Sequence, residues 1–130
     1  MKKEIIQNNG DIPDLDVSDK YLELRLKFDY VNLKTEEGVP TNDYPLNLSR
    51  EIYTLWVTYP LGVLVKIGLD KNLINTKIDL IKIICKAYQE IYEEEMSDRL
   101  YSIWGHGLGD LGLNRIYIRK DGIIKLGVDS

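Results

Sequence analysis

The 130-residue sequence contains only one cysteine, Cys85, one histidine, His106, and one phenylalanine, Phe28. A single cysteine excludes an internal disulfide and any metal motif built from cysteines, and it favours a reducing, cytoplasmic location. No apolar run reaches the roughly 18 residues that a membrane-spanning helix needs, so no membrane partner is expected. The first ten residues also lack the apolar stretch of a secretory signal. We therefore expect a soluble, cytoplasmic protein.

Basic residues are outnumbered, with 17 Lys and Arg against 21 Asp and Glu, which gives a formal charge of −4. This balance argues against a molecule that binds nucleic acid over its whole surface, because duplex affinity rests on neutralising phosphates. A net negative charge is still compatible with a local basic face. The content of 44% hydrophobic and 29% charged residues is typical of a folded protein, and the length fits one domain over residues 1–130.

Residues 1–20 are polar and acidic, with four aspartates around Pro13, and they predict an extended acidic arm. A calcium loop needs ligands at alternate positions, a central glycine and a glutamate at position twelve. Only Asp14 and Asp16 alternate, so we expect no metal site and no cofactor here. The four aspartates are Asp11, Asp14, Asp16 and Asp19.

Alternating apolar and polar residues predict a half-buried strand over residues 21–30. Residues 51–70 predict a hairpin, because odd-numbered apolar residues recur in both arms and paired residues share a face. This parity requires a three-residue loop, 60–62, that pairs Tyr59 with Val63 and gives Gly62 a positive φ. A loop of about twenty residues separates the strand from the hairpin, and loops of that length are either functional or contain a short element.

Apolar residues at helical spacing predict one long helix from about residue 76 to 95. Thr76 and Asp79 predict a capping box at its start, with Asn75 as an alternative cap. The last apolar segment, 116–128, predicts a second hairpin whose three-residue loop ends in Gly122. The expected fold class is α+β: a mostly antiparallel sheet of about five strands in the order β-β-β-α-β-β, with one main helix packed on one face.

Residues 100–112 contain Trp104, His106, Asp110 and four of the ten glycines. The glycines match the spacing G-x-G-x-x-G, but a dinucleotide site needs a strand before the motif and a helix after it, the reverse of the order predicted here. A catalytic interpretation uses His106 as a general base oriented by Asp110, although no nucleophile motif accompanies it. The simpler interpretation is a glycine-rich turn from helix to strand, with Trp104 at the end of the sheet.

The sheet face opposite the predicted core carries six basic residues against two acidic ones, Glu23 and Asp29. This gives a local balance of +4 and leaves −8 for the rest of the chain. Aromatic rings among cations on an open sheet are used by single-stranded RNA binders. Exposed sheet faces also favour the same residue types for strand propensity and solubility alone. The basic residues are Arg25, Lys27, Lys66, Arg115, Arg119 and Lys125. The candidate binding residues are Trp56, Lys66, Arg115, Tyr117, Arg119 and Lys125, with Trp56 expected opposite Lys66 and Tyr117 opposite Lys125.

Three functions are compatible with these features. The leading hypothesis is a non-catalytic protein-binding module, because nine tyrosines and two tryptophans suit an adaptable interface. Its partner would be another protein or a second copy of the chain, and an immunity-like or inhibitory role follows by compositional analogy with small acidic proteins that block basic toxins. The alternative is single-stranded nucleic-acid binding through the basic face. The third option is a small enzyme that uses His106.

The same face would also carry three apolar side chains, Trp56, Leu64 and Ile123. Monomers seldom expose large contiguous apolar patches, so something must cover them. We predict that the 31–50 loop or the acidic arm packs against a sheet face, or that two chains meet through it. For the arm, the expected partners are Arg115, Arg119 and Lys125.

Overall fold

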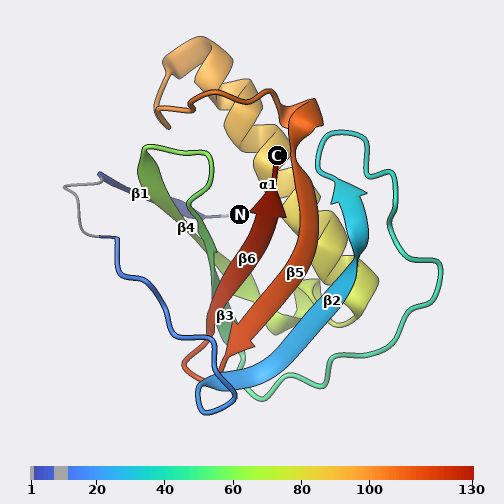
Figure 1. The fold of residues 1–130 in the computed structure, drawn as a ribbon. Helices are drawn as coiled ribbons and strands as arrows, with labels where there is room; N and C mark the ends of the chain where they lie inside the picture. The colour runs from blue at the N-terminus through green and yellow to red at the C-terminus, as the bar shows by residue number, and fades with distance from the viewer. Residues whose placement is uncertain (1, 8–11) are drawn as a thin grey trace.

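The structure, a computed structural model, describes residues 2–7 and 12–130. One main helix packs on a six-stranded mixed sheet in the order β1-β4-β3-β6-β5-β2 (Figure 1). The α+β class with a mostly antiparallel sheet is confirmed. The elements are β1 (Lys3–Gln7), β2 (Leu22–Asn32), β3 (Ile52–Val57), β4 (Val63–Asp70), the short 3-10 turn η1 (Lys71–Leu73), α1 (Lys77–Asp98), a second turn η2 (Leu108–Asp110), β5 (Gly112–Arg119) and β6 (Ile123–Asp129).

The register of both predicted hairpins is confirmed. Trp56 pairs with Lys66 in the β3–β4 hairpin, and Tyr117 pairs with Lys125 in the β5–β6 hairpin. Gly122 ends the second loop with φ of +92°, as its turn requires. The three-residue loop expected at 60–62 is wrong, because the β3–β4 ladder ends at Val57–Val65 and Tyr59 does not pair with Val63. The positive φ expected at Gly62 is also wrong. Gly62 is needed for space instead, because a Cβ there would lie 2.8 Å from Ser102 Cβ.

Two features of the sheet are absent from the sequence prediction. Lys3–Gln7 in the N-terminal arm forms an edge strand, β1, antiparallel to β4. The two hairpins are joined by a parallel contact between β3 and β6, at the pairs Thr54–Ile123 and Leu55–Ile124. The N–H of Thr54 also donates to the carbonyl oxygen of Gly122 at 2.8 Å. The sheet is therefore continuous across both hairpins.

Helix α1 lies across one face of this sheet and forms the core with it (Figure 1). The Thr76 hydroxyl accepts a hydrogen bond from the N–H of Asp79, as the predicted cap requires, and Arg99 ends the helix in the left-handed conformation. Ile81, Ile84 and Ile91 are fully buried among strand side chains. No helix of the described residues is long and apolar enough to cross a membrane.

The long loop after β2 covers the beginning of α1. The Asp43 carboxylate accepts a hydrogen bond from the N–H of Ile78 at 3.0 Å, and this bond holds the pKa of Asp43 below its ordinary value. Pro45 forms an isolated bridge with Thr76, and the Leu46 side chain is buried. The loop therefore contributes to the core from the helix side of the sheet.

Strand β2 has register shifts between Leu22 and Leu24 and between Lys27 and Val31. Glu23, one of the two acids predicted on the basic face, accepts a hydrogen bond from the buried Tyr53 hydroxyl at 2.7 Å, so it lies on the helix side. The bulge at this position reverses the direction of its side chain. Strand β1 brings another acid to the basic face, because Glu4 pairs with Lys66.

Strand β1 is tied to the helix by its Lys3 side chain. The Lys3 ammonium forms an ion pair with Glu94 of α1, whose carboxylate also accepts a hydrogen bond from the buried Tyr101 hydroxyl. These two hydrogen bonds lower the pKa of Glu94.

We expect Gly122→Ala to lower the free energy of unfolding by about 1–3 kcal/mol, because a Cβ at positive φ is strained and would lie 2.8 Å from Arg50 Nε. The control Gly68→Ala, in β4, adds a Cβ that meets no atom within 4 Å. It should stabilise the protein by less than about 1 kcal/mol. Urea unfolding of both variants measures the difference, and equal effects would contradict the turn assignment.

Glu94→Gln should destabilise the protein at pH 7 by on the order of 1 kcal/mol, discounted for the partial exposure of this carboxylate. Because its pKa is lowered in the folded state, its contribution is present above the ordinary value of 4.5 and is lost as the pH falls through the folded value. The variant should therefore lose less stability than the unmodified chain between pH 7 and pH 3. Exposed Glu93→Gln is the control in the same urea titrations, and matching acid sensitivities would exclude the Lys3–Glu94 contact as the cause.

Candidate functional site

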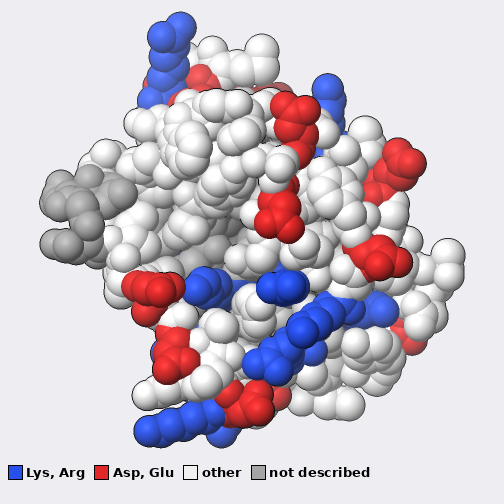
Figure 2. Space-filling model, in the orientation of Figure 1, with Lys and Arg blue, Asp and Glu red and all other residues white. Residues whose placement is uncertain are grey.

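The sheet face opposite α1 carries the predicted basic residues, and the N-terminal arm lies along it. Figure 2 shows Lys and Arg side chains as a band across this face, with uncharged residues around a hollow above the band. We call this surface the basic face and define it by Arg25, Lys27, Lys66, Arg115, Arg119 and Lys125. Arm residues 12–20 contact three of these six cations.

Each of the three contacts comes from a different strand. Lys125 of β6 pairs with Asp14 at 3.2 Å and donates to the carbonyl oxygen of Leu15 at 3.3 Å. Arg25 of β2 pairs with Asp19 at 3.3 Å. Arg119 of β5 donates to the carbonyl oxygen of Asp16. The predicted packing of the acidic arm on the basic face is thus confirmed for Arg119 and Lys125.

Arg119 is the most firmly held of these cations. Its guanidinium pairs with Asp121 at 2.9 Å and lies 5.3 Å from the centre of the Tyr21 ring. The Asp121 hydrogen bond raises the pKa of Arg119, and the same bond lowers the pKa of Asp121. Backbone and side-chain hydrogen bonds from Ser18 hold the pKa of Asp16 below its ordinary value. The arm therefore meets a fixed cation through a locally ordered turn.

Trp56 is brought next to Lys66 as predicted, with the ammonium 5.1 Å from the ring centre. Its side chain is nevertheless only 9% exposed, and neighbouring Leu64 is 3% exposed. Ile6 of β1 pairs with Leu64, and Ile12 and Leu15 line the same pocket as Trp56. Two parts of the N-terminal arm, strand β1 and residues 12–15, thus cover the apolar part of this face, as predicted from the sequence.

The remaining predicted binding residues are more accessible. Tyr117 is half-buried between its register partners Arg25 and Lys125. Arg115 and Lys27 are exposed, and no carboxylate of the described residues pairs with either. The predicted contact between the arm and Arg115 is not found among the described residues, and Asp11 lies outside them. The basic face therefore retains three cations that residues 12–20 do not contact: Lys27, Arg115 and Lys66, whose ammonium lies over Trp56.

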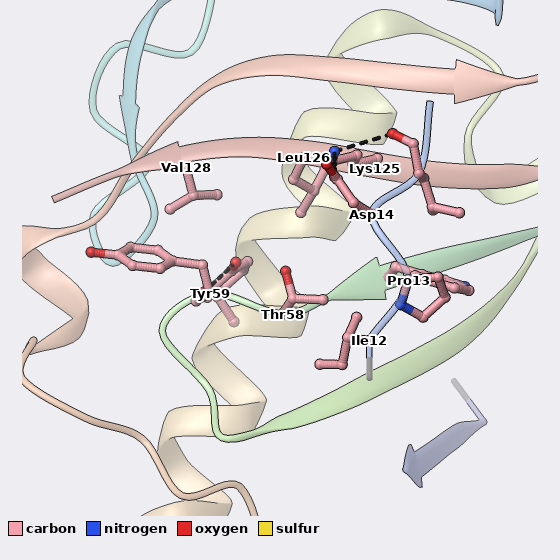
Figure 3. Close-up of a pocket in the computed structure, with 11 residues that line it drawn as sticks. Ile12, Pro13, Asp14, Thr58, Tyr59, Lys125, Leu126 and Val128 are labelled. Carbon is pink, nitrogen blue, oxygen red and sulfur yellow. Dashed lines mark hydrogen bonds and ion pairs between the residues drawn. The ribbon is translucent and has the colours of Figure 1, made fainter. Parts of the chain in front are cut away.

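A pocket of about 300 Å³ opens beside the arm, between β3 and β6. Figure 3 shows Leu126 and Val128 of β6 on one side of it and Thr58 and Tyr59 beyond the end of β3 on the other. Ile12, Pro13 and Asp14 of the arm border it, and the dashed line beside Lys125 marks the contact of this side chain with the arm. The remaining lining residues are Leu15, Trp56 and Tyr88.

The glycine-rich segment forms an aromatic cluster beside this pocket, around the lining residue Tyr59. Trp104 is 53% exposed and meets the Tyr59 ring edge-on at 5.6 Å, and the His106 ring lies 5.9 Å from both. His106 Nε2 is 3.4 Å from Ser130 Oγ. Asp110 does not hydrogen-bond to His106 in the described part of the chain; its carbonyl oxygen accepts from Tyr30 instead. The structure therefore does not bring together the two residues of the catalytic interpretation.

The described residues contain no group of three or more His, Cys, Asp or Glu side chains that could hold a metal ion. Burial raises the pKa of the Cys85 thiol to about 12, so it is a poor nucleophile. Burial also raises the pKa of Tyr92 to about 12, and its hydroxyl donates to the His106 carbonyl oxygen. These groups support the fold, and the arrangement on the basic face is suited to binding.

The sequence predicted the cations of this site and Trp56, but not the other apolar residues that line the pocket. Ile12 and Leu15 lie among aspartates, and their spacing of three residues was a signal for one apolar edge on the arm. Leu126 and Val128 are even-numbered residues of the last hairpin and pack against the core, and no local pattern indicates that β3 and β6 diverge beside them.

The chain matches no protein-family model, no curated protein and no solved structure.

The ion pairs of the arm should keep Trp56 covered. In a Trp104→Phe background, where Trp56 is the only tryptophan, Asp14→Asn/Asp19→Asn should raise the acrylamide quenching constant about twofold, because exposed ion pairs contribute up to about 1 kcal/mol each. Raising NaCl to about 0.5 M should act in the same direction on the unmodified arm.

The matched control is Asp29→Asn/Asp98→Asn, which removes the same charge from two exposed carboxylates outside the arm. Equal quenching in the two double variants would show that Trp56 is covered without help from the ion pairs.

Proposed function

We propose that this protein is a non-catalytic protein-binding module whose basic face receives an extended acidic segment of a partner protein. The observation that carries the proposal is that this face already receives such a segment from its own chain, residues 12–20. Two carboxylates and three backbone carbonyl oxygens of the arm meet three cations on three strands. A partner segment with acids at similar spacing can make the same contacts.

The arm is suited to be displaced because its charged groups are bound at the surface. The side chains of Asp14 and Asp19 are 98% and 92% exposed, and exposed ion pairs are worth about 0–1 kcal/mol each. Arg115 and Lys27 have no described carboxylate partner and are available to a longer acidic segment. The arm therefore acts as a weak internal occupant, and a partner gains from cations that the arm leaves free.

Single-stranded nucleic acid is the second candidate, favoured by the band of Lys and Arg on this face (Figure 2). Stacking needs an accessible ring, and Trp56 is almost fully covered, with Lys66 already over it. An acidic occupant also fits the arm directly, whereas phosphates must first remove it. An enzyme that uses His106 has less support, because the described contacts give this histidine neither Asp110 nor a nucleophile beyond Ser130.

An immunity-like or inhibitory role, self-association and a cytoplasmic location are finer parts of the same proposal. The single buried cysteine suits a reducing compartment. A second copy of the chain is a partner of the right chemistry, because its own arm is the acidic segment that the basic face receives.

The proposal is tested with a capped synthetic peptide of residues 12–19 and with the full chain carrying Asp14→Lys/Asp19→Lys. Charge reversal repels the arm from the basic face, so this chain should bind the peptide at least about tenfold more tightly than the unmodified chain, in which the arm competes. Fluorescence anisotropy of the labelled peptide at about 50 mM NaCl measures both affinities.

The same arm-reversed chain with Arg119→Met should lose most of this binding, whereas the control Arg50→Met, outside the basic face, should not. A peptide with Asn in place of every Asp should also fail to bind. A thymidine oligonucleotide that binds more tightly than the peptide would favour the nucleic-acid function. Absence of peptide binding by the folded, arm-reversed chain would overturn the proposal.

A further inference from the structure

The pocket exists because the sheet divides between its two hairpins. β3 pairs with β6 only at Thr54–Ile123 and Leu55–Ile124. Beyond these pairs β3 continues along β4 as far as Val57–Val65, while β6 continues along β5 as far as Asp129–Gly112. The two hairpins therefore separate toward the ends of β3 and β6, and side chains of both border the space between them (Figure 3).

The space is large enough for a small organic molecule. An apolar cavity of about 150 Å³ holds benzene, and this pocket measures about 300 Å³ with the arm in place. Trp56, Leu126, Val128, Ile12 and Leu15 supply an apolar lining. The Tyr88 hydroxyl at its border already donates to the Tyr59 carbonyl oxygen at 2.8 Å. A ring with a short side chain therefore fits the lining without leaving this hydroxyl unpaired.

The charge at the border selects the polar group of such a ligand. Among the described lining residues, Lys125 is the one cation and Asp14 the one anion. The Lys125 side chain is about one-third exposed and that of its partner Asp14 is 98% exposed, so their ion pair is weak and can be exchanged. Lys66 and Arg119 on the same face add positive potential. A ligand carboxylate can therefore take the place of Asp14 on Lys125.

We propose that this pocket binds a small apolar monocarboxylate, with its hydrocarbon part against Trp56, Leu126 and Val128 and its carboxylate on Lys125. The site goes beyond the proposed partner binding and does not depend on it, because the pocket stays open while the arm lies on the basic face. Trp56, at the border, reports occupancy directly.

The probe is 3-phenylpropionate, added to the full ¹⁵N-labelled chain at pH 7 up to about 10 mM, with a dissociation constant expected on the order of 1 mM. The indole N–H resonance of Trp56, assigned with Trp104→Phe, should shift and saturate. Lys125→Met should weaken binding about five- to tenfold, because it removes a hydrogen bond to a charged group. Asp14→Asn should tighten binding about two- to fivefold, because it frees the ammonium.

Lys27→Met is the matched control: it removes a lysine from the same face outside the pocket and should leave the affinity unchanged. The neutral probe 3-phenylpropanamide should bind about five- to tenfold more weakly to the unmodified chain and be insensitive to Lys125→Met. Thr58→Trp adds bulk at an exposed lining position and should abolish binding without unfolding the chain. No saturable shift, or equal binding of 3-phenylpropylamine, would overturn the proposal, as would equal effects of Lys125→Met and Lys27→Met.

Discussion

The parallel contact between β3 and β6 is the interaction on which the continuity of the sheet depends. Each hairpin closes locally through a short connection, but no local connection joins one hairpin to the other. Their contact consists of two register pairs and the hydrogen bond from Thr54 to Gly122. Such short pairing cannot hold the two hairpins together by itself. The buried side of α1 packs in one core with strands of both hairpins and therefore stabilises their contact.

The shortness of the β3–β6 contact also explains the shape of the candidate site. A longer parallel ladder would have closed the sheet beneath the arm, and Trp56 and Val128 would have packed against a neighbouring strand. Because the ladder ends early, an apolar opening remains at the edge of a basic surface. Apolar and charged contacts therefore lie side by side, and the arm uses both: Ile12 and Leu15 border the opening, while Asp14 and Asp19 meet cations.

The parts of the fold that depend on neighbouring residues could be predicted from the sequence. Parity fixed both hairpin registers, and helical spacing with Thr76 located α1. Strand β1 was missed because its sequence, Lys-Glu-Ile-Ile-Gln, does not alternate cleanly, and Glu23 was placed on the wrong face because a bulge interrupts the period. The cations of the site followed from the same parity. The pocket did not, because it depends on where a long-range parallel contact ends, and no local pattern encodes that.

The two edge strands of the sheet, β1 and β2, are poorly suited to pair with a strand of another chain. An uncovered edge strand presents unpaired backbone groups that can template pairing with another molecule. Here β1 offers only five residues, and β2 carries two register shifts together with exposed Arg25, Lys27 and Asp29. Irregular backbone and charge make such an edge a poor template for continuing the ladder. Both edges therefore disfavour edge-to-edge pairing of this sheet with another sheet, and the proposed binding uses a sheet face, where side chains rather than backbone groups make the contacts.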